Sequence, residues 1–306
     1  MPAKVILNPY SNRWRAEKRW PEAALALKNA GVDFELAISE RHGHATELAE
    51  LAARRGFSPI IAAGGDGTIG EVVNGLARAA KYDTEPLGPL GLMPLGSAND
   101  FVTNLGLPLE LAAAARVIAA GVRRNIDVCR VNELFFANNS AMGLEPYVTL
   151  IQQRITWIKG IPRYLLAALR GVMDRPRWTV RIEWDDGQFE GPVSLVTVGN
   201  GPRTGGVFFM APHASLSDGK LTFVYGGREK RRDILRLLPR TMKPGKGSYV
   251  EMDGIFEHEA TYIKIHIETT TPAHADGEIF SAGIQDLHYR IEPGRLQVLV
   301  EEGSGS

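Results

Sequence analysis

Residues 60–77 read IIAAGGDGTIGEVVNGLA, and this stretch decides the fold. Its apolar start is typical of a buried strand, and its second half is typical of a helix that carries Glu71 and Asn74. The turn between them consists of Gly64, Gly65, Asp66, Gly67 and Thr68. Consecutive glycines let the backbone bring its N–H groups close to a phosphate, and a helix start adds unpaired N–H donors. The stretch therefore predicts a phosphate-binding turn, although glycines alone would also suit a plain connection.

The turn differs from two common nucleotide-binding motifs. It lacks the Gly-Lys-Ser/Thr of a Walker A loop and the G-x-G-x-x-G spacing of a dinucleotide-binding fold. Strand patterns at residues 4–7, 33–38, 59–63 and 89–94 alternate with helix patterns at residues 16–29, 46–55 and 69–80. This order predicts a layered α/β domain with a parallel sheet, in which ligands bind at the carboxyl ends of the strands.

The pattern changes after about Asp127. Short β-rich runs follow at residues 134–137, 178–184, 193–198, 221–225 and 262–267, and they predict a second, mainly antiparallel domain. We expect the α/β domain over residues 1–127, the β-rich domain over residues 128–286 and a flexible tail over residues 302–306. Residues 287–301 either complete the first domain or finish the second.

Composition excludes several classes of protein. The chain has 306 residues, of which 44% are hydrophobic and 23% charged, so it can bury a sizeable core. A single cysteine, Cys129, excludes an internal disulfide and fits a reducing cytosol. No apolar run approaches the roughly 20 residues of a membrane span, and no signal peptide is expected. The seven histidines lack metal-ligand spacing, so His42 and His44 are interpreted as parts of a polar loop.

The formal net charge is zero, which argues against a nucleic-acid-binding protein. Two segments are nevertheless basic. Residues 151–178 contain six basic and one acidic residue, and residues 228–246 contain eight basic and two acidic residues, which gives +5 and +6. These segments predict contact with something anionic.

Further motifs follow the turn in order along nearly the whole chain. They are Asn8-Pro9, residues 94–101 (PLGSANDF), Gly199-Asn200-Gly201, Gly205-Gly206, Pro212, Asp218-Gly219 and Asp276-Gly277-Glu278. With GGDGT and the E-V-x-N-G continuation from Glu71, they resemble the diacylglycerol kinase catalytic-domain family, the soluble bacterial lipid kinases related to sphingosine kinases. GGDGT alone is shared with NAD kinases. The resemblance implies an NAD kinase/diacylglycerol kinase-like α/β domain followed by a β-rich domain.

The sequence departs from the family pattern in four places. Asn12 follows Ser11 where the family usually has glycine, but asparagine also tolerates a positive φ. Ser97 replaces a threonine and keeps the hydroxyl group. Glu145 stands near a position where relatives often carry aspartate, and no third glycine follows Gly206. The last two departures are expected to affect the geometry of substrate binding more than nucleotide binding.

The resemblance implies that Asp276 is the general base that receives the proton of the acceptor hydroxyl. The alternative is a simple Asp-Gly hairpin turn. Asp66 is expected to face the phosphates through Mg²⁺ or to orient the turn, because a bare carboxylate would repel a polyphosphate. If its segment is extended, Glu278 lies on the same face as Asp276 and adds to the acidic cluster.

The remaining candidate residues follow from the same resemblance. Candidates for ATP contact are Asn8, Ser11, Thr46 at a helix cap, Glu71, Gly96, Ser97, Asn99 and Asp100. An Asn-Asp helix cap is the competing interpretation for Asn99 and Asp100. Asp218 is the candidate side-chain ligand of a structural Mg²⁺, with an Asp-Gly turn as the alternative.

We therefore expect a Mg²⁺- and ATP-dependent kinase that phosphorylates a lipid alcohol. The segment 150–173 mixes Trp157, Ile158, Tyr164, Leu165 and Leu166 with basic residues, which favours a helix on an anionic membrane surface. The predicted enzyme is thus cytoplasmic and peripherally membrane-associated. An NAD kinase-like enzyme and a catalytically silent ATP- or lipid-binding regulator are the alternatives, and a homodimer is left open.

Overall fold

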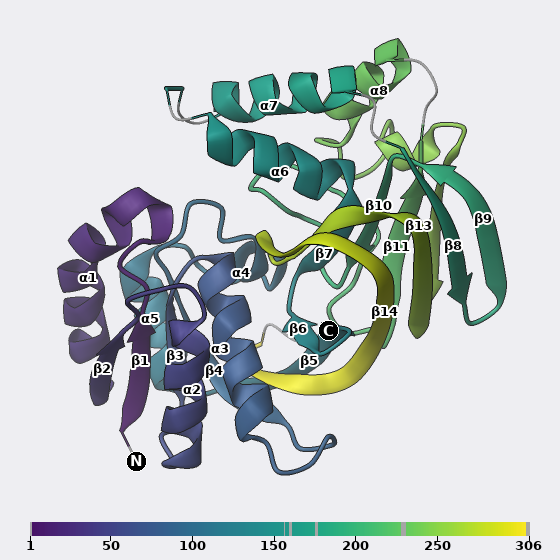
Figure 1. The fold of residues 1–306 in the computed structure, drawn as a ribbon. Coiled ribbons are helices and arrows are strands. Elements are labelled where there is room, and N and C mark those ends of the chain that lie inside the picture. Colours follow the sequence, from purple (N-terminus) through teal and green to yellow (C-terminus); the bar gives the residue numbers. More distant parts are fainter. Residues whose placement is uncertain (1, 156, 159–160, 175–176, 228–230, 304–306) are drawn as a thin grey trace.

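The first half of the chain forms a parallel sheet covered by helices on both faces. The computed structural model describes residues 2–155, 157–158, 161–174, 177–227 and 231–303 (Figure 1). The parallel strands are β1 (Ala3–Leu7), β2 (Phe34–Ile38), β3 (Ile60–Gly64) and β4 (Leu87–Pro94). The helices are α1 (Ser11–Asn29), α2 (His44–Arg54), α3 (Asp66–Ala79), α4 (Asp100–Asn104) and α5 (Leu111–Ala120).

The side chains of β1 alternate between the two faces of the sheet, and each face is covered by different helices. Val5 and Leu7 of β1 pack in one buried cluster with residues of α1 and α5, whereas Ile6 packs in another with residues of α2 and α3. Successive side chains of a strand point to opposite faces, so a strand that is apolar throughout needs helices on both sides. The predicted layered α/β fold is therefore confirmed.

The second half is mainly antiparallel. Its strands are β5 (Arg123–Val131), β6 (Leu134–Phe136), β7 (Asn139–Gly143), β8 (Trp178–Trp184), β9 (Gly187–Val193), β10 (Leu195–Gly199), β11 (Leu221–Gly226), β12 (Ile255–Ala260), β13 (Tyr262–Ala275) and β14 (Glu278–Leu299). Its helices are α6 (Leu144–Arg154), α7 (Ile161–Asp174) and α8 (Arg231–Leu237), with the short 3₁₀ turns η1 (Leu238–Arg240) and η2 (Tyr249–Glu251). Trp184, Phe223 and Tyr225 lie in its buried core.

Strand β14 joins the two halves. Its first part pairs antiparallel with β13, and further along Leu296 and Val298 pair in parallel with Leu87 and Leu90 of β4. The described strands thus form one sheet, whose main path has the order β12-β11-β10-β7-β13-β14-β4-β3-β1-β2. Off this path, β5 pairs with β14 and β6, and β8 pairs with β13 and β9. Figure 1 shows β14 curving between the halves. The domain boundaries expected from the sequence remain a prediction.

Several helix boundaries differ from the sequence-based expectation. Helix α1 begins at Ser11 rather than at residue 16, with a left-handed turn over Asn12, Arg13 and Trp14. The apolar segment 150–173 contributes to two helices, α6 and α7, rather than to one. No helix in the described residues is long and apolar enough to cross a membrane.

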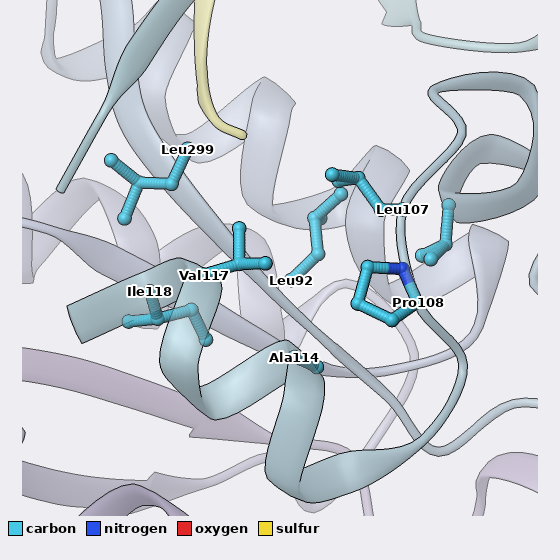
Figure 2. Close-up of a pocket in the computed structure, with 8 residues that line it drawn as sticks. Leu92, Leu107, Pro108, Ala114, Val117, Ile118 and Leu299 are labelled. Atoms are coloured by element: carbon cyan, nitrogen blue, oxygen red, sulfur yellow. The ribbon is translucent and has the colours of Figure 1, made fainter. Parts of the chain in front are cut away.

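A small apolar cavity lies between α5, β4 and β14 (Figure 2). It measures about 10 Å³, and its lining includes Leu92, Leu107, Val117 and Leu299. This volume is at the lower limit for a single water molecule, and the lining offers no polar side chain. The cavity is therefore a packing defect of the core and cannot hold a substrate.

Candidate active site

The predicted phosphate-binding turn lies where β3 meets α3. Strand β3 ends at Gly64, Gly65 is the extended residue before the helix, and α3 begins at Asp66. The turn is thus shorter than the five residues expected, because Asp66, Gly67 and Thr68 already form the first helical turn. The first N–H groups of a helix have no partner within it, and they favour an anion at this end.

A second turn, after β4, touches the first one backbone to backbone. A Cβ atom on Gly96 would lie 2.4 Å from the Cα of Gly65, so only glycine allows this approach. The Asn99 side chain accepts from Gly96 N at 2.9 Å and donates to Gly96 O at 3.2 Å, with a left-handed φ of 52°. Asn99 therefore holds this turn together, and its side chain does not cap α4.

Polar side chains after β1 connect to the same place. Asn8 Nδ2 donates to Thr68 Oγ1 at 3.1 Å, and Ser11 Oγ lies 3.2 Å from that oxygen. The exposed Ser97 donates to Asn12 Oδ1 at 3.0 Å. Asn12 has a φ of 52°, as expected for a residue that replaces glycine. The ends of β1, β3 and β4 thus converge on one edge of the sheet.

Asp66 links the two turns. Its Oδ1 accepts from Phe101 N at 2.9 Å, so this carboxylate satisfies an N–H group at the start of α4. Burial raises the pKa of Asp66, and the surrounding backbone N–H groups lower it in part. Of the two roles expected for Asp66, the contact with α4 corresponds to orienting the turn.

Asp100 connects the first half of the chain to the second. Both of its carboxylate oxygens accept from Gly206 N at 3.0 Å, and Arg203 Nε lies 3.3 Å from Oδ1. Burial, together with the charge of Asp66, raises the pKa of Asp100 to about 6. Its carboxylate is therefore engaged with residues 203–206 of the second half.

Asp276 and Gly277 form the two-residue turn between β13 and β14. Both have a positive φ, 47° and 82°, as type I′ hairpin turns require. The simple turn is thus present, but the Asp276 side chain is buried. Its carboxylate accepts from the backbone N–H groups of residues 137, 138 and 139 at 2.8, 2.9 and 3.1 Å. Burial raises the pKa of Asp276 to about 6, even though these three hydrogen bonds lower it.

The Asp276 carboxylate lies directly against α3. A Cβ atom on Gly70 would be 3.0 Å from Asp276 Oδ2, and one on Gly67 would be 2.8 Å from Glu278 Oε1. Glu278 is exposed and begins β14, whereas Asp276 is in the turn, so the segment between them is not extended and the condition for a shared strand face is not met. Even so, both carboxylates lie beside the first two turns of the helix that follows the glycines.

Two predicted nucleotide contacts have other partners. The Glu71 carboxylate accepts from Gly43 N at 2.9 Å and Ala45 N at 3.0 Å, at the start of α2. Thr46 was expected to cap that helix, but Gly43 occupies the cap position and Thr46 Oγ1 donates to Glu71 O at 3.0 Å. Both side chains therefore fasten α2 to α3.

A buried pair lies behind Asp276. His274 Nε2 lies 3.0 Å from Glu145 Oε1, and Thr197 Oγ1 donates to Glu145 Oε2 at 3.1 Å. Asn139 Nδ2 approaches Glu145 Oε1 at 3.5 Å, and the backbone N–H of Asn139 bonds to Asp276. The substituted acid Glu145 is thus connected through Asn139 to the candidate base.

Sequence reasoning gave no role to several buried polar residues. Asn74 donates to Phe135 O and accepts from Phe135 N, which fixes β6 to α3. Asp127 accepts from Gly219 N at 2.6 Å and Gly294 N at 2.7 Å. Asn74 lay in the quoted E-V-x-N-G motif, whereas Asp127 had no local signal because its partners are distant in the sequence.

Asp218, the candidate metal ligand, forms the expected Asp-Gly turn and accepts from Lys220 N at 3.0 Å. Burial raises its pKa, and the charges of Glu259 and Asp127 add to the rise. Within the described ranges, no three His, Cys, Asp or Glu side chains gather as a metal site. Any cation here would depend on one carboxylate and backbone oxygens.

Comparison with known proteins decides the family. The family model for the diacylglycerol kinase catalytic domain matches residues 2–131, and that for the YegS C-terminal NAD kinase beta sandwich-like domain matches residues 139–300. The diacylglycerol kinase of Bacillus subtilis (strain 168) is 31% identical over 278 residues, which are 90% of this chain and 89% of that protein. The chain belongs to the diacylglycerol kinase family.

Further comparisons agree with this family. The diacylglycerol kinase of Staphylococcus haemolyticus is 30% identical over 90% of this chain and 82% of that protein. A diacylglycerol kinase structure from Bacillus anthracis str. Sterne has a TM-score of 0.71 at 21% identity and covers 99% of this chain and 98% of its own. An NAD kinase from Archaeoglobus fulgidus, solved with ATP, has a TM-score of 0.55 at 12% identity and covers 99% and 95%. These two structures support the fold alone. Membership of the diacylglycerol kinase family shows that the chain is a lipid kinase.

Proposed function

We propose that this member of the diacylglycerol kinase family transfers the γ-phosphate of ATP to a hydroxyl group of a lipid alcohol such as diacylglycerol. One observation carries the proposal: the buried Asp276 carboxylate lies against Gly70, one turn into the helix that begins at the predicted phosphate site. A phosphate donor and a proton acceptor are thereby side by side. Phosphoryl transfer needs this positioning more than it needs covalent chemistry.

The phosphates would be held mainly by backbone. The N–H groups at the start of α3 point toward this edge, and the glycines at 65 and 96 leave no side chain in the way. Thr68, Asn8 and Ser11 supply polar side chains beside them. ATP as the donor is supported by the kinase family and by the NAD kinase of the same fold that was solved with ATP.

The donor set at this site suits Mg²⁺ bound largely through phosphate oxygens. The carboxylates of Asp66, Asp100 and Asp276 already accept from backbone N–H groups, whereas Glu278 is exposed beside Gly67. Mg²⁺ commonly uses one or two carboxylates together with substrate phosphates and waters. We assign Glu278, and Asp66 through the oxygen that does not bond to Phe101, as its nearest protein ligands. Asp218 is assigned as the side-chain ligand of a separate structural ion. The ion would supply neutralisation of phosphate charge.

Asp276 would act as the general base. Three N–H groups fix its carboxylate: Oδ1 accepts two of them, whereas Oδ2 accepts one and keeps a lone pair that can accept the hydroxyl proton. The lipid oxygen then bonds to the γ-phosphorus while the bond to the β-phosphate oxygen breaks and ADP leaves. A pKa of about 6 leaves this base ionised at neutral pH while improving its proton affinity over an ordinary aspartate.

The activity should therefore fall in acid. Because the base must be ionised, kcat is expected to be constant above pH 7 and to decrease about tenfold per pH unit below the Asp276 pKa of about 6. Asp100 has a similar pKa, so the profile is also measured for Asp100→Asn. An acid limb that disappears in Asp100→Asn would assign the ionisation to Asp100 and contradict the role of Asp276.

The proposed reaction can be tested with radiolabelled ATP. The protein is offered diacylglycerol, a sphingoid base, phosphatidylglycerol and NAD, each with and without Mg²⁺. Labelled lipid that requires Mg²⁺ supports the proposal and identifies the acceptor. Label in NAD alone would support the NAD kinase-like alternative, and label in none of them would support a silent regulator.

Contact with an anionic membrane surface is proposed for the helical cap formed by α6, α7 and α8. These helices lie together at one end, away from α1 and α5 (Figure 1). Helix α7 buries Ala167 and Ala168, whereas Leu169 and Met173, one turn apart, are exposed with Arg170 between them. Trp157, in the connection before α7, is 76% exposed. Apolar side chains among cations suit an interfacial helix.

Other basic residues extend this face. The exposed cations include Arg154, Arg232, Arg236 and Lys243. Several residues of the two basic segments lie outside the part of the chain that the structure describes. They are Lys159, Arg175, Arg228 and Lys230, together with the side chains of Tyr164, Leu165 and Arg231.

Replacing Leu169 by aspartate is expected to weaken binding to vesicles that contain an anionic lipid by about tenfold, because it adds a negative charge and removes an exposed apolar side chain that would enter the membrane interface. The measurement is vesicle flotation at low and high salt. The matched control is Leu25→Asp on α1, where Leu25 is 59% exposed. Equal flotation of both variants and the unchanged protein would exclude this face as the contact.

A further inference from the structure

A groove with a volume of about 730 Å³ lies over β5, β13 and β14, away from the candidate active site. Its polar lining includes Arg130, Asn132, Tyr262, Lys264, His288 and Arg290. Its lining includes Gly219, which follows the candidate metal ligand Asp218, but none of the residues discussed as catalytic or nucleotide-binding. The volume falls within the range of about 300–1,000 Å³ that is usual for small-molecule sites. The groove is thus large enough for a ligand of its own.

Strand register places the cations of the groove in two neighbouring rows. Arg290 of β14 is directly opposite Tyr262 of β13 on one side and Arg130 of β5 on the other. Two residues earlier on β14, His288 is opposite Lys264. Side chains that are opposite across a strand pair, or two positions apart along a strand, share one face of the sheet. The four basic side chains therefore belong to a single surface.

The charged side chains that line the groove have a positive surplus. Outside the lining, Glu183 of β8 is opposite Lys264, but it pairs with Arg181. The charged lining consists of Arg130, Lys264 and Arg290 against Glu133, which leaves a surplus of two positive charges with His288 neutral. Glu133 is paired with Arg130. Among the described residues, Lys264 and Arg290 have no ion pair, and Lys264 lies only over the Tyr262 ring at 6.0 Å. Arg130 and Arg290 are directly opposite each other, and like charges in this position are destabilising. Glu133 offsets this repulsion in part through its pair with Arg130.

We propose that this groove binds a phosphate monoester group. Such a group carries close to two negative charges near neutral pH, which matches the surplus of the lining. The Arg290 fork can bind two phosphate oxygens, and the Lys264 ammonium and the Tyr262 hydroxyl offer further donors on the same face. Arg130 already donates to Asn132 O and to Glu133, and Asn132 Nδ2 donates to Asp286 O. The group is carried either by a soluble phosphate or by the headgroup of a lipid such as phosphatidic acid.

The site is tested by calorimetric titration of the whole protein with inorganic phosphate, in the presence of saturating Mg²⁺ and a non-hydrolysable ATP analogue. The double variant Lys264→Gln/Arg290→Gln is expected to raise the phosphate dissociation constant at least tenfold. The matched control is Arg116→Gln on α5, where Arg116 is exposed and does not belong to this surface. The control should bind phosphate like the unchanged protein. A double variant that also binds like the unchanged protein would overturn the proposal.

A second arm distinguishes the two sources of phosphate. Flotation on phosphatidylcholine vesicles is compared with and without phosphatidic acid, in the Leu169→Asp background, so that the helical cap contributes little. If the double variant loses the added binding to phosphatidic acid, the groove accepts a lipid headgroup. If the double variant loses binding of inorganic phosphate but keeps the added binding to phosphatidic acid, the groove accepts a soluble phosphate. Retention of both kinds of binding rejects the site, and this outcome is independent of whether the protein phosphorylates lipids.

Discussion

Replacing Asp276 by asparagine is expected to lower kcat by about 10²–10⁴-fold, because an amide cannot take the proton of the acceptor hydroxyl. The dissociation constant for ATP should change little, since the side chain touches α3 beyond its first turn. Asparagine tolerates the positive φ at this position, and its carbonyl oxygen can still accept from residues 138 and 139. The measurement is single-turnover transfer from ATP together with calorimetric ATP binding.

The lost contact with Ala137 N has a structural cost as well. An unsatisfied buried N–H group is expected to lower the free energy of unfolding by about 1–3 kcal/mol. Asp185→Asn is the matched control, because Asp185 also accepts from backbone N–H groups, those of Thr261 and Tyr262, but lies far from α3 in the sheet. Near-normal turnover of the Asp276 variant would refute its role as base.

Replacing Gly96 by alanine is expected to weaken ATP binding at least tenfold, which is about 1.4 kcal/mol. The new Cβ atom would lie 2.4 Å from Gly65 Cα and 2.6 Å from Asn99 Oδ1. Because the first of these atoms is backbone, the turn before α3 has to move. The free energy of unfolding should also fall, by about 1–3 kcal/mol, as for other overpacked sites.

The control for this change is Gly245→Ala. Gly245 has no atom within 4 Å of an added Cβ and no positive φ, so neither binding nor stability should change. Calorimetry with an ATP analogue and urea unfolding give the two readouts. If Gly96→Ala binds ATP as tightly as the unchanged protein, the phosphates lie elsewhere.

The layered fold could be predicted because its signals are local. The run of residues 60–64 is apolar on both faces, and glycines at 64 and 65 end the strand before a helix, so strand, turn and helix follow from neighbours in the sequence. The left-handed turn before the regular part of α1 could be predicted only in part. Asn12 replaces a glycine and tolerates a positive φ, but Arg13 and Trp14, which are also left-handed, carry no such local signal.

The candidate site could be predicted only in part. The motifs correctly brought together residues that the fold places at one edge, such as Asn8, Thr68 and Gly96. They could not show what each side chain contacts. Glu71 was predicted to contact the nucleotide. Its hydrogen-bond partners are instead Gly43 and Ala45, which precede it by 28 and 26 residues and lie at the start of α2. Their proximity depends on how α2 packs against α3.

The surroundings of Asp276 could not be predicted from the sequence either. From the sequence, Asp276 was interpreted either as the general base or as part of a simple Asp-Gly hairpin turn. The structure contains the turn and also buries the carboxylate, because β6 and β7 bring the N–H groups of residues 137–139 to it. Such long-range hydrogen bonds leave no periodic pattern.

The most direct test of the account is a crystal structure with Mg²⁺, a non-hydrolysable ATP analogue and a short-chain diacylglycerol. We expect the β- and γ-phosphates to bind at the N–H groups that begin α3. The acceptor hydroxyl should lie within hydrogen-bond distance, about 3 Å, of the Asp276 carboxylate. Phosphates bound at any other edge of the sheet, or a hydroxyl group remote from Asp276, would contradict it.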